Sequence, residues 1–351
     1  MTARVNQIIV GVDTHKSNHI AVAINTQGAK LGGLTIPTTS QGYCDLEQWA
    51  QALGPVKAFG IEGTGSYGAG LSRLLQAKGH TVIDVMRPNR QLRYLHGKSD
   101  NLDAEGAARS VLNGQATACA KAQTGSSEMI RHLKIARDSA VKSRSQAMIT
   151  LKTLLINAPT QLRDSLDQVS GKIALVRHVA ALRPGEMISP TASAKAAMRA
   201  IARRWLSLNE EVQQLDQHLK SLVRDRAPEL MNAHGISTMT VADMLILVGD
   251  NPERIKSKAA LAKLCGVCPI PASSGKTNRM RLNRGGNRQA NAALYRVAIV
   301  RMRDHQPTQA YVAKRTADGK GKREIIRCLK RYIAREIYRH LCVPTPGTGV
   351  A

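Results

Sequence analysis

The sequence predicts an α/β domain at the N-terminus followed by a mainly helical remainder, and three observations carry this prediction. Residues 1 to about 120 alternate between strand and helix patterns, which is typical of a mixed sheet covered by helices. Between Ser126 and Arg226 apolar residues recur three and four positions apart, as on one face of a helix. From Ala233 to about Leu341 a third, mainly helical region carries a large excess of Lys and Arg.

The elements of the first domain follow from short apolar runs separated by turns. Strands are predicted at residues 8–12, 19–23, 31–37, 57–62 and 81–85, and helices at residues 46–53 and 71–78. Three strands joined by short connections, followed by strand–helix alternation, resemble the ribonuclease H-like fold. In that fold acids on two neighbouring strands converge with acids on a late helix.

A heptad seam runs along the middle of the chain. Its apolar members are Met198, Ile201, Trp205, Leu208, Val212, Leu215, Leu219 and Leu222. Alternating spacings of three and four are typical of helices that pack along their length. Residues 130–155 are the expected partner helix, which ends before Pro159. Two interpretations stay open: intramolecular packing of the two helices, and a coiled coil that joins two chains.

These patterns divide the chain into three predicted domains. Their bounds are residues 1–125, 126–230 and 231–342. A chain of 351 residues is long enough for such domains to have their own cores. Residues 343–351 form a predicted disordered tail, because prolines there lie among Gly and Thr.

The charge balance points to a polyanionic partner. A formal net charge of +26 favours nucleic acid over an anionic membrane surface. Between Lys276 and Arg339 there are 18 Lys or Arg and four acids, which predicts a phosphate-binding surface rather than an ordinary solvated face. The sequence has no apolar run of about 18 residues, and strand-like sequence begins by Ile8. Neither a membrane span nor a signal peptide is therefore expected.

Cysteines and aromatic residues give weak signals. Only Cys265 and Cys268 have a ligand-like spacing. Because a second pair is missing, buried thiols in a reducing cytosol are expected rather than a zinc site. Aromatic residues make up only 3% of the chain, so base-stacking platforms for single strands are not evident from the sequence.

Four acids stand out in this basic chain, because each lies where a metal-binding carboxylate is useful. Asp13 and Glu62 directly follow predicted strands, and Asp100 and Asp103 share one face of a predicted helix. Two-metal phosphodiester chemistry needs carboxylates that converge on ions roughly 4 Å apart, and Mg²⁺ prefers such oxygen ligands. These residues therefore predict a magnesium site. The alternative is that Asp13 lies in a turn and that Asp100 caps a helix.

A serine loop is the second candidate site. Ser273 and Ser274 precede Gly275 and Lys276, and several arginines follow. A serine beside such cations can attack a phosphodiester while the cations stabilise the pentacoordinate phosphate. The alternative is a flexible surface turn. No histidine is near in sequence, so a general base has to come from elsewhere in the fold.

Five motifs together carry a resemblance that covers almost the whole chain. They lie at residues 10–13, 61–65, 98–104, 266–275 and 285–288. In order and spacing they resemble the DEDD-type insertion-sequence transposases of the IS110 family, which are bridge-RNA-guided recombinases related to Piv-type DNA invertases. One departure is the run Gly235-Ile236-Ser237, where the family usually has a Gly-Ile-Gly turn of a helix-hairpin-helix-like segment.

The resemblance implies a RuvC-like N-terminal domain, a coiled-coil middle and a C-terminal transposase domain. It implies that the four acids are catalytic and bind Mg²⁺. It also implies that Ser274, with Ser273 as the fallback, forms a covalent phosphoserine link to DNA. The residues expected to contact nucleic acid are Lys276, Arg279, Arg281, Arg284, Arg288, Lys322 and Arg323.

The resemblance also implies partners. These are DNA at the element ends and at the target, a guide (bridge) RNA, and further copies of the chain, as dimers that assemble into a tetramer. One protomer's acids then complete another's serine site, in the cytoplasm of a bacterium and near its nucleoid. Two rival functions remain. One is a RuvC-like, metal-dependent, structure-selective nuclease that uses water. The other is a nucleic-acid scaffold protein that uses only charge and the helical seam.

Overall fold

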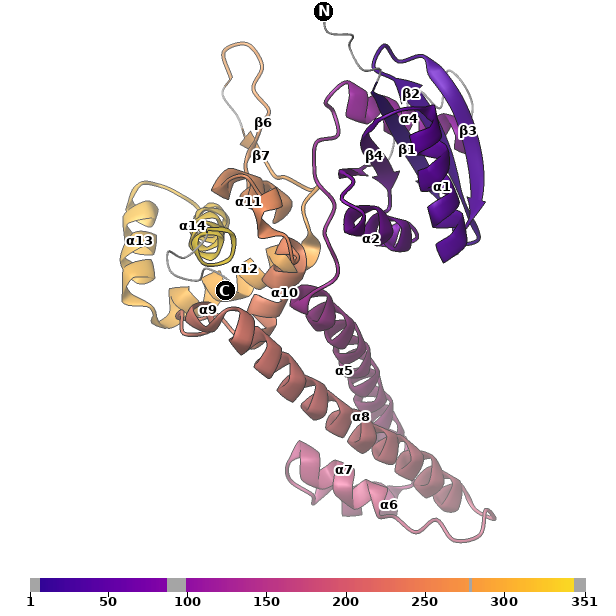
Figure 1. Ribbon diagram of the computed structural model, residues 1–351. Coiled ribbons are helices and arrows are strands. Elements are labelled where there is room, and N and C mark those ends of the chain that lie inside the picture. The colour runs from indigo at the N-terminus through magenta and orange to yellow at the C-terminus, as the bar shows by residue number, and fades with distance from the viewer. Residues whose placement is uncertain (1–6, 87–98, 278–279, 344–351) are drawn as a thin grey trace, which may run out of the picture. The chain divides into compact units, whose positions relative to one another are not determined.

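The chain divides into two compact units, whose helices and strands are labelled in Figure 1. The structure, a computed structural model, describes residues 7–86, 99–277 and 280–343. The first unit consists of Met1–Glu128, Leu247–Leu264 and Leu341–Ala351, and the second of Met129–Ile246 and Cys265–His340. The three-domain division made from the sequence stays a prediction, and most of the predicted tail lies outside the described residues.

The first unit is built on a five-stranded sheet in the order β3-β2-β1-β4-β5. Its elements are β1 (Ile8–Thr14), β2 (Asn18–Asn25), β3 (Lys30–Pro37), α1 (Ser40–Leu53), β4 (Val56–Glu62), α2 (Ala69–Ala77), β5 (Val82–Val85) and α4 (Asp100–Leu112). β1, β2 and β3 pair antiparallel, whereas β4 runs parallel to β1 and to β5. The predicted mixed α/β sheet is confirmed, and the ribonuclease H-like assignment stays a prediction.

Helix α1 begins earlier than predicted, at Ser40 rather than at residue 46. The Thr39 hydroxyl caps it by accepting a hydrogen bond from the Gly42 amide at 3.1 Å. The sequence prediction relied on apolar periodicity. The polar first turn has none, so only the cap marks its start.

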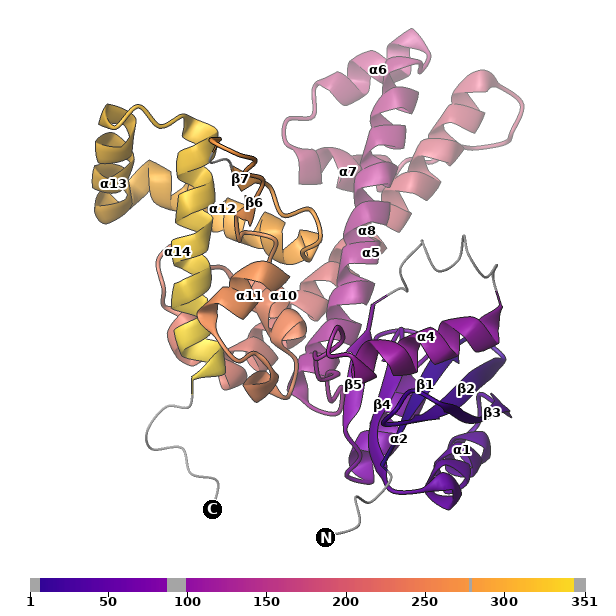
Figure 2. The same ribbon diagram turned by 90° about the horizontal axis from the view of Figure 1, so that it is seen from above.

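Helices cover both faces of this sheet (Figure 2). α1 and α2 pack on one face, where Val12 and Phe59 are fully buried. α4 packs on the other face, and Gly11 and Gly60 permit its close approach. A methyl group at Gly11 would lie 2.0 Å from the carbonyl oxygen of Ala104 in α4. The first turn of α4 is thereby held near the end of β1.

A later segment completes the first unit. It contains the 3₁₀ helix η1 (Pro252–Arg254) and α11 (Lys258–Leu264). Asp250 accepts hydrogen bonds from the amides of Gly125 and Ser127 at 3.0 and 2.7 Å, at the start of the long helix that follows the sheet. Asn251 accepts another from the Ala122 amide at 3.1 Å. This segment is therefore pinned to the connection that leaves the sheet.

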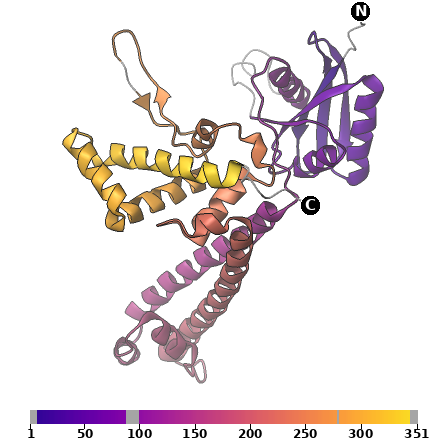
Figure 3. The same cartoon turned by 60° about the vertical axis from the view of Figure 1, so that its left-hand side comes forward.

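Two long helices dominate the first part of the second unit and lie side by side (Figures 1 and 3). Its elements here are α5 (Ser126–Ile156), α6 (Thr160–Asp167), α7 (Lys172–Ala180) and α8 (Pro190–Arg226). The predicted seam lies in α8, where Met198, Trp205 and Leu219 are buried. Met198 and Trp205 share a core with α5, α6 and α7, and Arg137 of α5 pairs with Asp216 of α8 at 2.9 Å. The seam thus packs within the chain, and a coiled coil between chains is not supported.

As far as the structure describes it, the rest of the second unit is mainly helical and carries one hairpin. Its elements are α9 (Pro228–Met231), α10 (Thr238–Val248), β6 (Ile270–Pro271), β7 (Met280–Arg281), α12 (Arg288–Asp304), α13 (Gln306–Ala317) and α14 (Lys322–Cys342). Buried Asp243 of α10 pairs with Lys134 of α5 and Arg296 of α12 at 3.1 and 3.2 Å. At the departure from the family turn, the Ser237 hydroxyl accepts a hydrogen bond from the Thr240 amide at 3.3 Å and so caps α10. Over the described residues, no helix is long and apolar enough to cross a membrane.

Candidate acidic site and serine hairpin

The parallel pairing of β1 with β4 places two of the predicted acids side by side. Val12 pairs with Ile61, so Asp13 and Glu62 occupy neighbouring positions where the two strands end. Each acid follows, by two residues, a glycine that faces α4. Side chains two apart along a strand point to the same side, so both acids lie on the α4 face of the sheet.

The first turn of α4 supplies the other two acids. The Ser99 hydroxyl caps this helix by accepting a hydrogen bond from the Leu102 amide at 3.3 Å. The cap is therefore Ser99, and the Asp100 carboxylate is left for other contacts. Asp100 and Asp103 both lie in the first turn, where the helix dipole favours negative charge.

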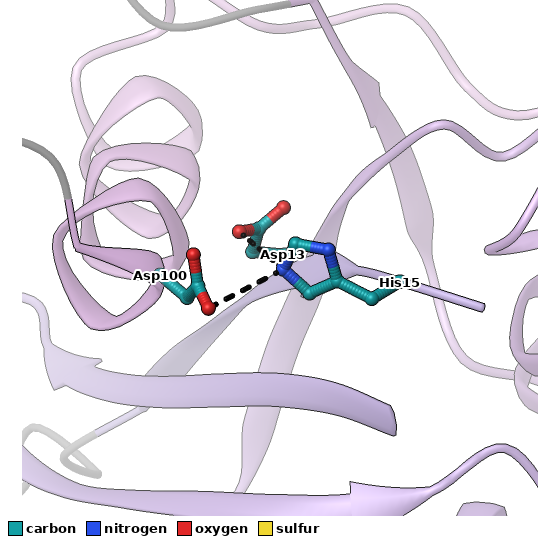
Figure 4. Close-up of side chains that lie close together, drawn as sticks. All are labelled: Asp13, His15 and Asp100. Carbon is teal, nitrogen blue, oxygen red and sulfur yellow. Dashed lines mark ion pairs between the residues drawn. The ribbon is translucent and has the colours of Figure 1, made fainter. Parts of the chain in front are cut away.

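Asp13, His15 and Asp100 form a compact cluster (Figure 4). The Nε2 atom of His15 lies 3.2 Å from a carboxylate oxygen of Asp13 and 3.6 Å from one of Asp100. One potential ligand atom from each residue lies within 4.8 Å of the others. Asp13 is only 8% exposed, whereas the side chains of His15 and Asp100 are 43% and 46% exposed. The cluster is therefore buried at Asp13 and accessible at Asp100.

The surroundings of Asp13 raise its pKa above the ordinary value of an aspartate. Burial is the largest cause, and charge repulsion from Asp103 and Asp100 adds to it, while His15 acts in the opposite direction. A cation bound between these carboxylates would favour their charged forms. The electrostatics of the cluster thus match a site for a divalent metal ion.

The donor set also fits such an ion. Carboxylate oxygens suit Mg²⁺ and Mn²⁺, and an imidazole nitrogen suits transition metals. The Nε2 atom of His15 is enclosed and makes no hydrogen bond with a described residue, although it faces two carboxylates. An acidic site for a divalent metal is therefore supported, and the donor atoms do not choose between magnesium and manganese.

The four predicted acids differ in how close they lie to the cluster of Asp13, His15 and Asp100. Asp103 is buried close enough to Asp13 to act on it through its charge. Glu62 is half-buried on the neighbouring strand and lies outside the three-residue cluster. Sequence reasoning missed His15, whose one signal was its position two residues after Asp13 at the same strand end. The roles of the four acids stay predictions.

Hydrogen bonds fix the chain where β4 ends. The Thr14 hydroxyl donates to the Glu62 carbonyl at 2.8 Å and so links the ends of β1 and β4. Gly63 follows with φ +72°, a conformation that favours glycine. The Thr64 hydroxyl then donates to the Asp84 carboxylate of β5 at 2.6 Å. These hydrogen bonds restrain the backbone on either side of Glu62, where the chain leaves the sheet.

The serine loop forms a β-hairpin that projects from the helices of its unit (Figure 3). Its tip is a two-residue turn of Gly275 and Lys276, closed by two backbone hydrogen bonds between Ser274 and Thr277 at 3.2 and 3.0 Å. Gly275 has φ +52°, which fits the first central position of such a turn. Residues 271–277 are exposed, and among the described residues the Ser274 side chain has no hydrogen-bond partner. Ser274 is thus presented to solvent beside the tip.

Close backbone packing fixes the base of this hairpin. A methyl group at Gly286 would lie 2.1 Å from the Gly266 nitrogen. Asn291 of α12 donates to the carbonyls of Cys265 and Gly266 at 2.9 and 3.1 Å and accepts from Lys330 of α14 at 2.7 Å. Burial is the main cause that lowers the pKa of Lys330. Sequence reasoning missed Asn291 and Lys330, because their partners lie far away in the sequence.

The predicted phosphate contacts that the structure describes are all exposed. They are Lys276, Arg281, Arg284, Arg288, Lys322 and Arg323. Lys276 and Arg281 lie in the hairpin, Arg284 lies between it and α12, Arg288 begins α12, and the last two begin α14. Arg279 lies outside the described residues. Exposure is what a phosphate-binding surface requires, and the individual contacts stay predictions.

Two family models match the chain in the regions that hold these sites. The model of DEDD transposases of the IS110 type, described as a transposase, matches residues 10–158. A second, described as the transposase IS116/IS110/IS902 family, matches residues 227–313. The first range contains the four acids and His15, and the second contains Ser274, Gly286 and Asn291. These matches support an IS110-family transposase.

Relatives from insertion elements agree with this assignment. An uncharacterized protein of insertion element IS116 from Streptomyces clavuligerus is 23% identical over an alignment of 365 positions, gaps included, that covers 91% of this chain and 90% of the relative. An uncharacterized protein of IS110 from Streptomyces coelicolor is 27% identical over 34% of this chain and 30% of its own length. One of IS900 from Mycobacterium paratuberculosis is 22% identical over 50% of this chain and 42% of its own length. Similarity to these transposases supports a DNA-processing enzyme that binds DNA.

Proposed function

We propose that this IS110-family transposase is a DNA recombinase that moves its own insertion element through a covalent phosphoserine–DNA intermediate. The observation that carries the proposal is the exposed Ser274, held beside the tip of a basic hairpin. The proposal assigns a ribonuclease H-like, RuvC-like fold to the first unit, supported by its strand order and by its acids at the ends of β1 and β4.

In the proposed reaction the Ser274 oxygen attacks the phosphorus of a DNA phosphodiester. An oxygen–phosphorus bond to serine forms as a phosphorus–oxygen bond of the DNA breaks, and the released deoxyribose oxygen takes up a proton. Attack by a hydroxyl of the second DNA reverses these bond changes and frees the serine. Lys276 and Arg281 would stabilise the negative charge on the phosphate. Strands are then exchanged without net hydrolysis.

The proposed role of Asp13, Glu62, Asp100 and Asp103 is to hold a divalent metal, magnesium in this proposal, and to orient the reacting phosphate. Such an ion, when bound, supplies positive charge that polarises a phosphoryl oxygen. His15 would add a nitrogen ligand or restrain the carboxylates of Asp13 and Asp100, which it faces at 3.2 and 3.6 Å. Both functions act on the same phosphate, so loss of either should stop recombination.

The experiment incubates protein, guide RNA, magnesium and both DNA sites, and separates the products on a denaturing gel. We expect a DNA-linked protein species with the parent chain. Ser274→Ala should remove both that species and recombination, by a factor of about 10³ or more, as for other nucleophiles. Ser273→Ala, one residue away in the same exposed arm of the hairpin, is the matched control and should retain both. An unchanged adduct in Ser274→Ala would show that Ser274 is not the nucleophile, and an adduct that survives in both single variants and in the double variant would show that the serine mechanism is wrong.

A metal-dependent, structure-selective nuclease that uses water is the second candidate. The acidic cluster favours it, because metal-assisted hydrolysis needs no serine. This enzyme would release free DNA ends, form no adduct and tolerate Ser274→Ala. The same gel therefore separates the two functions.

We also propose a bridge RNA as the guide and a dimer that assembles into a tetramer as the active form, in the cytoplasm of a bacterium and near its nucleoid. The net charge of +26 supports a polyanionic partner of this kind. Pairing between guide and DNA would then carry sequence specificity. Sequencing of RNA that copurifies with the chain tests this. Enrichment of a structured RNA from the flank of the element supports it, and random cellular RNA contradicts it.

A further inference from the structure

A cavity in the second unit has no part in the proposed reaction. α12, α13 and α14 border it, and its volume is about 230 Å³. Ala298, Leu329 and Ile333 give it an apolar lining, and Tyr311 and Tyr332 complete one wall. Pockets for drug-sized ligands typically measure about 300–1,000 Å³, so this cavity suits a single ring system.

The two tyrosines form an aromatic corner. Their ring centroids are 5.5 Å apart and their planes meet at 81°. Burial and the neighbouring Cys328 raise the pKa of Tyr311 to about 12, so it stays a neutral phenol. Tyr332 is 52% exposed, and the guanidinium of Arg335 lies 5.4 Å from its ring centre. A restrained ring that is half open to solvent offers a stacking surface.

The charged residue in the cavity wall is already neutralised. Arg301 donates to both carboxylate oxygens of Glu336 at 2.7 and 2.8 Å, and to the His234 carbonyl at 2.8 Å. The buried Thr308 hydroxyl is hydrogen-bonded to His305 at 2.8 Å. Because these polar groups are satisfied, the lining favours a flat neutral ring over a phosphate or a carboxylate.

Two of the helices that border the cavity are strongly basic. The cations of α13 and α14 are Lys314, Arg315, Lys322, Arg323, Arg327, Lys330, Arg331, Arg335 and Arg339. Such charges attract the phosphates on either side of a nucleotide. They also repel a second copy of this basic chain. Charge therefore selects nucleic acid as the occupant over an apolar peptide segment.

We propose that this cavity binds an unstacked nucleobase of a single-stranded or locally opened nucleic acid, with Tyr332 stacking against the base. Stacking on an aromatic ring tolerates any base, and both DNA and RNA can supply one. The site would hold a strand in place and would not react with it. The inference rests on nucleic-acid binding by the transposase and is independent of the serine chemistry.

The test is photocrosslinking of the full-length Ser274→Ala chain in the presence of a metal chelator, so that neither proposed route of cleavage enters the measurement. Single-stranded DNA and RNA oligonucleotides each carry one 5-iodouracil base, and crosslinked peptides are identified by mass spectrometry. We expect adducts at Tyr332 or Tyr311, and the arm that forms them tells whether DNA or RNA is bound. Crosslinks confined to other regions of the chain would overturn the proposal.

Variants give the second readout. Tyr332→Ala should remove the adduct and weaken single-strand binding about fivefold or more, while binding of a blunt duplex stays unchanged. Tyr332→Phe keeps the ring and should keep both. Tyr295→Ala is the matched control, because Tyr295 of α12 is 48% exposed and does not line the cavity. An equal loss of single-strand and duplex binding in Tyr332→Ala, or the same loss in Tyr295→Ala, contradicts the site.

Discussion

His15 is the residue that most changes the interpretation of the acidic site. Four acids alone form a like-charged group, whose members disfavour one another's ionisation. In the structure an imidazole nitrogen lies between two of them, at 3.2 Å from Asp13 and 3.6 Å from Asp100. The candidate metal site is therefore a mixed set of oxygen and nitrogen donors. A site made only of carboxylates would favour magnesium, whereas this mixed set accepts manganese as well.

Asp13→Asn should make the metal-free protein more stable. In the folded state the pKa of Asp13 is raised, so its ionisation costs stability. The loss of stability begins as the pH rises past about 3.9, the pKa of this carboxyl in the unfolded chain. It reaches its full size once the pH exceeds the higher pKa of Asp13 in the folded chain. At neutral pH, with a chelator present, the variant should therefore unfold at a higher temperature than the parent. Thermal unfolding followed by circular dichroism measures this.

With a divalent metal ion present, the parent should unfold at a higher temperature than Asp13→Asn. Only the parent has the charged Asp13 carboxylate, so the ion binds its folded state more tightly. Asp45→Asn is the control, since Asp45 is exposed in the same unit, is not part of the acidic cluster, and is hydrogen-bonded only to Gln41 among the residues that the structure describes. Asp45→Asn should leave the unfolding temperature unchanged both in chelator and with metal. A parent chain that is the more stable of the two in chelator would contradict the electrostatic account of Asp13.

Single residues show where sequence reasoning reaches its limit. Asp13 and Glu62 could be predicted, because each closes an apolar run and parallel strands end at a common edge. Asn291 and Lys330 could not, because their hydrogen bonds join residues far apart in the chain. The aromatic corner of Tyr311 and Tyr332 was missed for the same reason, in a chain with only 3% aromatic residues.

At the scale of elements, the serine hairpin is a short ribbon whose exposed tip depends on a rigid base. Two-stranded ribbons are marginal in water on their own. Here the base is anchored by the approach of Gly286 to Gly266 and by the hydrogen bonds of Asn291. The predicted motif at residues 285–288 therefore has a physical explanation in the packing of the hairpin base, beside any contact with nucleic acid.

Gly286→Ala should destabilise the second unit by about 1–3 kcal/mol, the range for overpacked sites. The added methyl group would lie 2.1 Å from the backbone nitrogen of Gly266, so the backbone has to shift. Urea unfolding measures the loss, and faster amide exchange at residues 265–286 would locate it. Gly321→Ala is the matched control, because a methyl group there meets nothing within 4 Å. Equal stability of the two variants would show that the close approach is not needed.

At the scale of the whole molecule, the chain leaves the first unit after Glu128 and returns to it at Leu247. The return is fixed by Asp250, which bonds the amides of Gly125 and Ser127. Local periodicity carries no trace of such a contact, because its partners lie far apart in the chain. The helical middle is therefore an insertion between two parts of one unit.

The charge of +26 makes a prediction about DNA binding that belongs to the whole molecule. If six to ten phosphates are neutralised, affinity for duplex DNA should fall by about 10³–10⁵ between 50 and 200 mM salt. The double variant Lys322→Gln and Arg323→Gln removes two exposed cations of α14 and should reduce the slope of log affinity against log salt by about two. Fluorescence anisotropy across a salt series measures this slope.

The double variant Lys30→Gln and Lys57→Gln is the control for net charge. It removes two exposed cations from β3 and β4, so the total charge falls by the same amount as in the α14 variant. The salt slope reports phosphates that are neutralised at the contact, whereas net charge acts at long range on the association rate. The control should therefore keep the parent slope. Equal slopes for the two double variants would mean that DNA is attracted by overall charge, and that α14 is not part of the phosphate-binding surface.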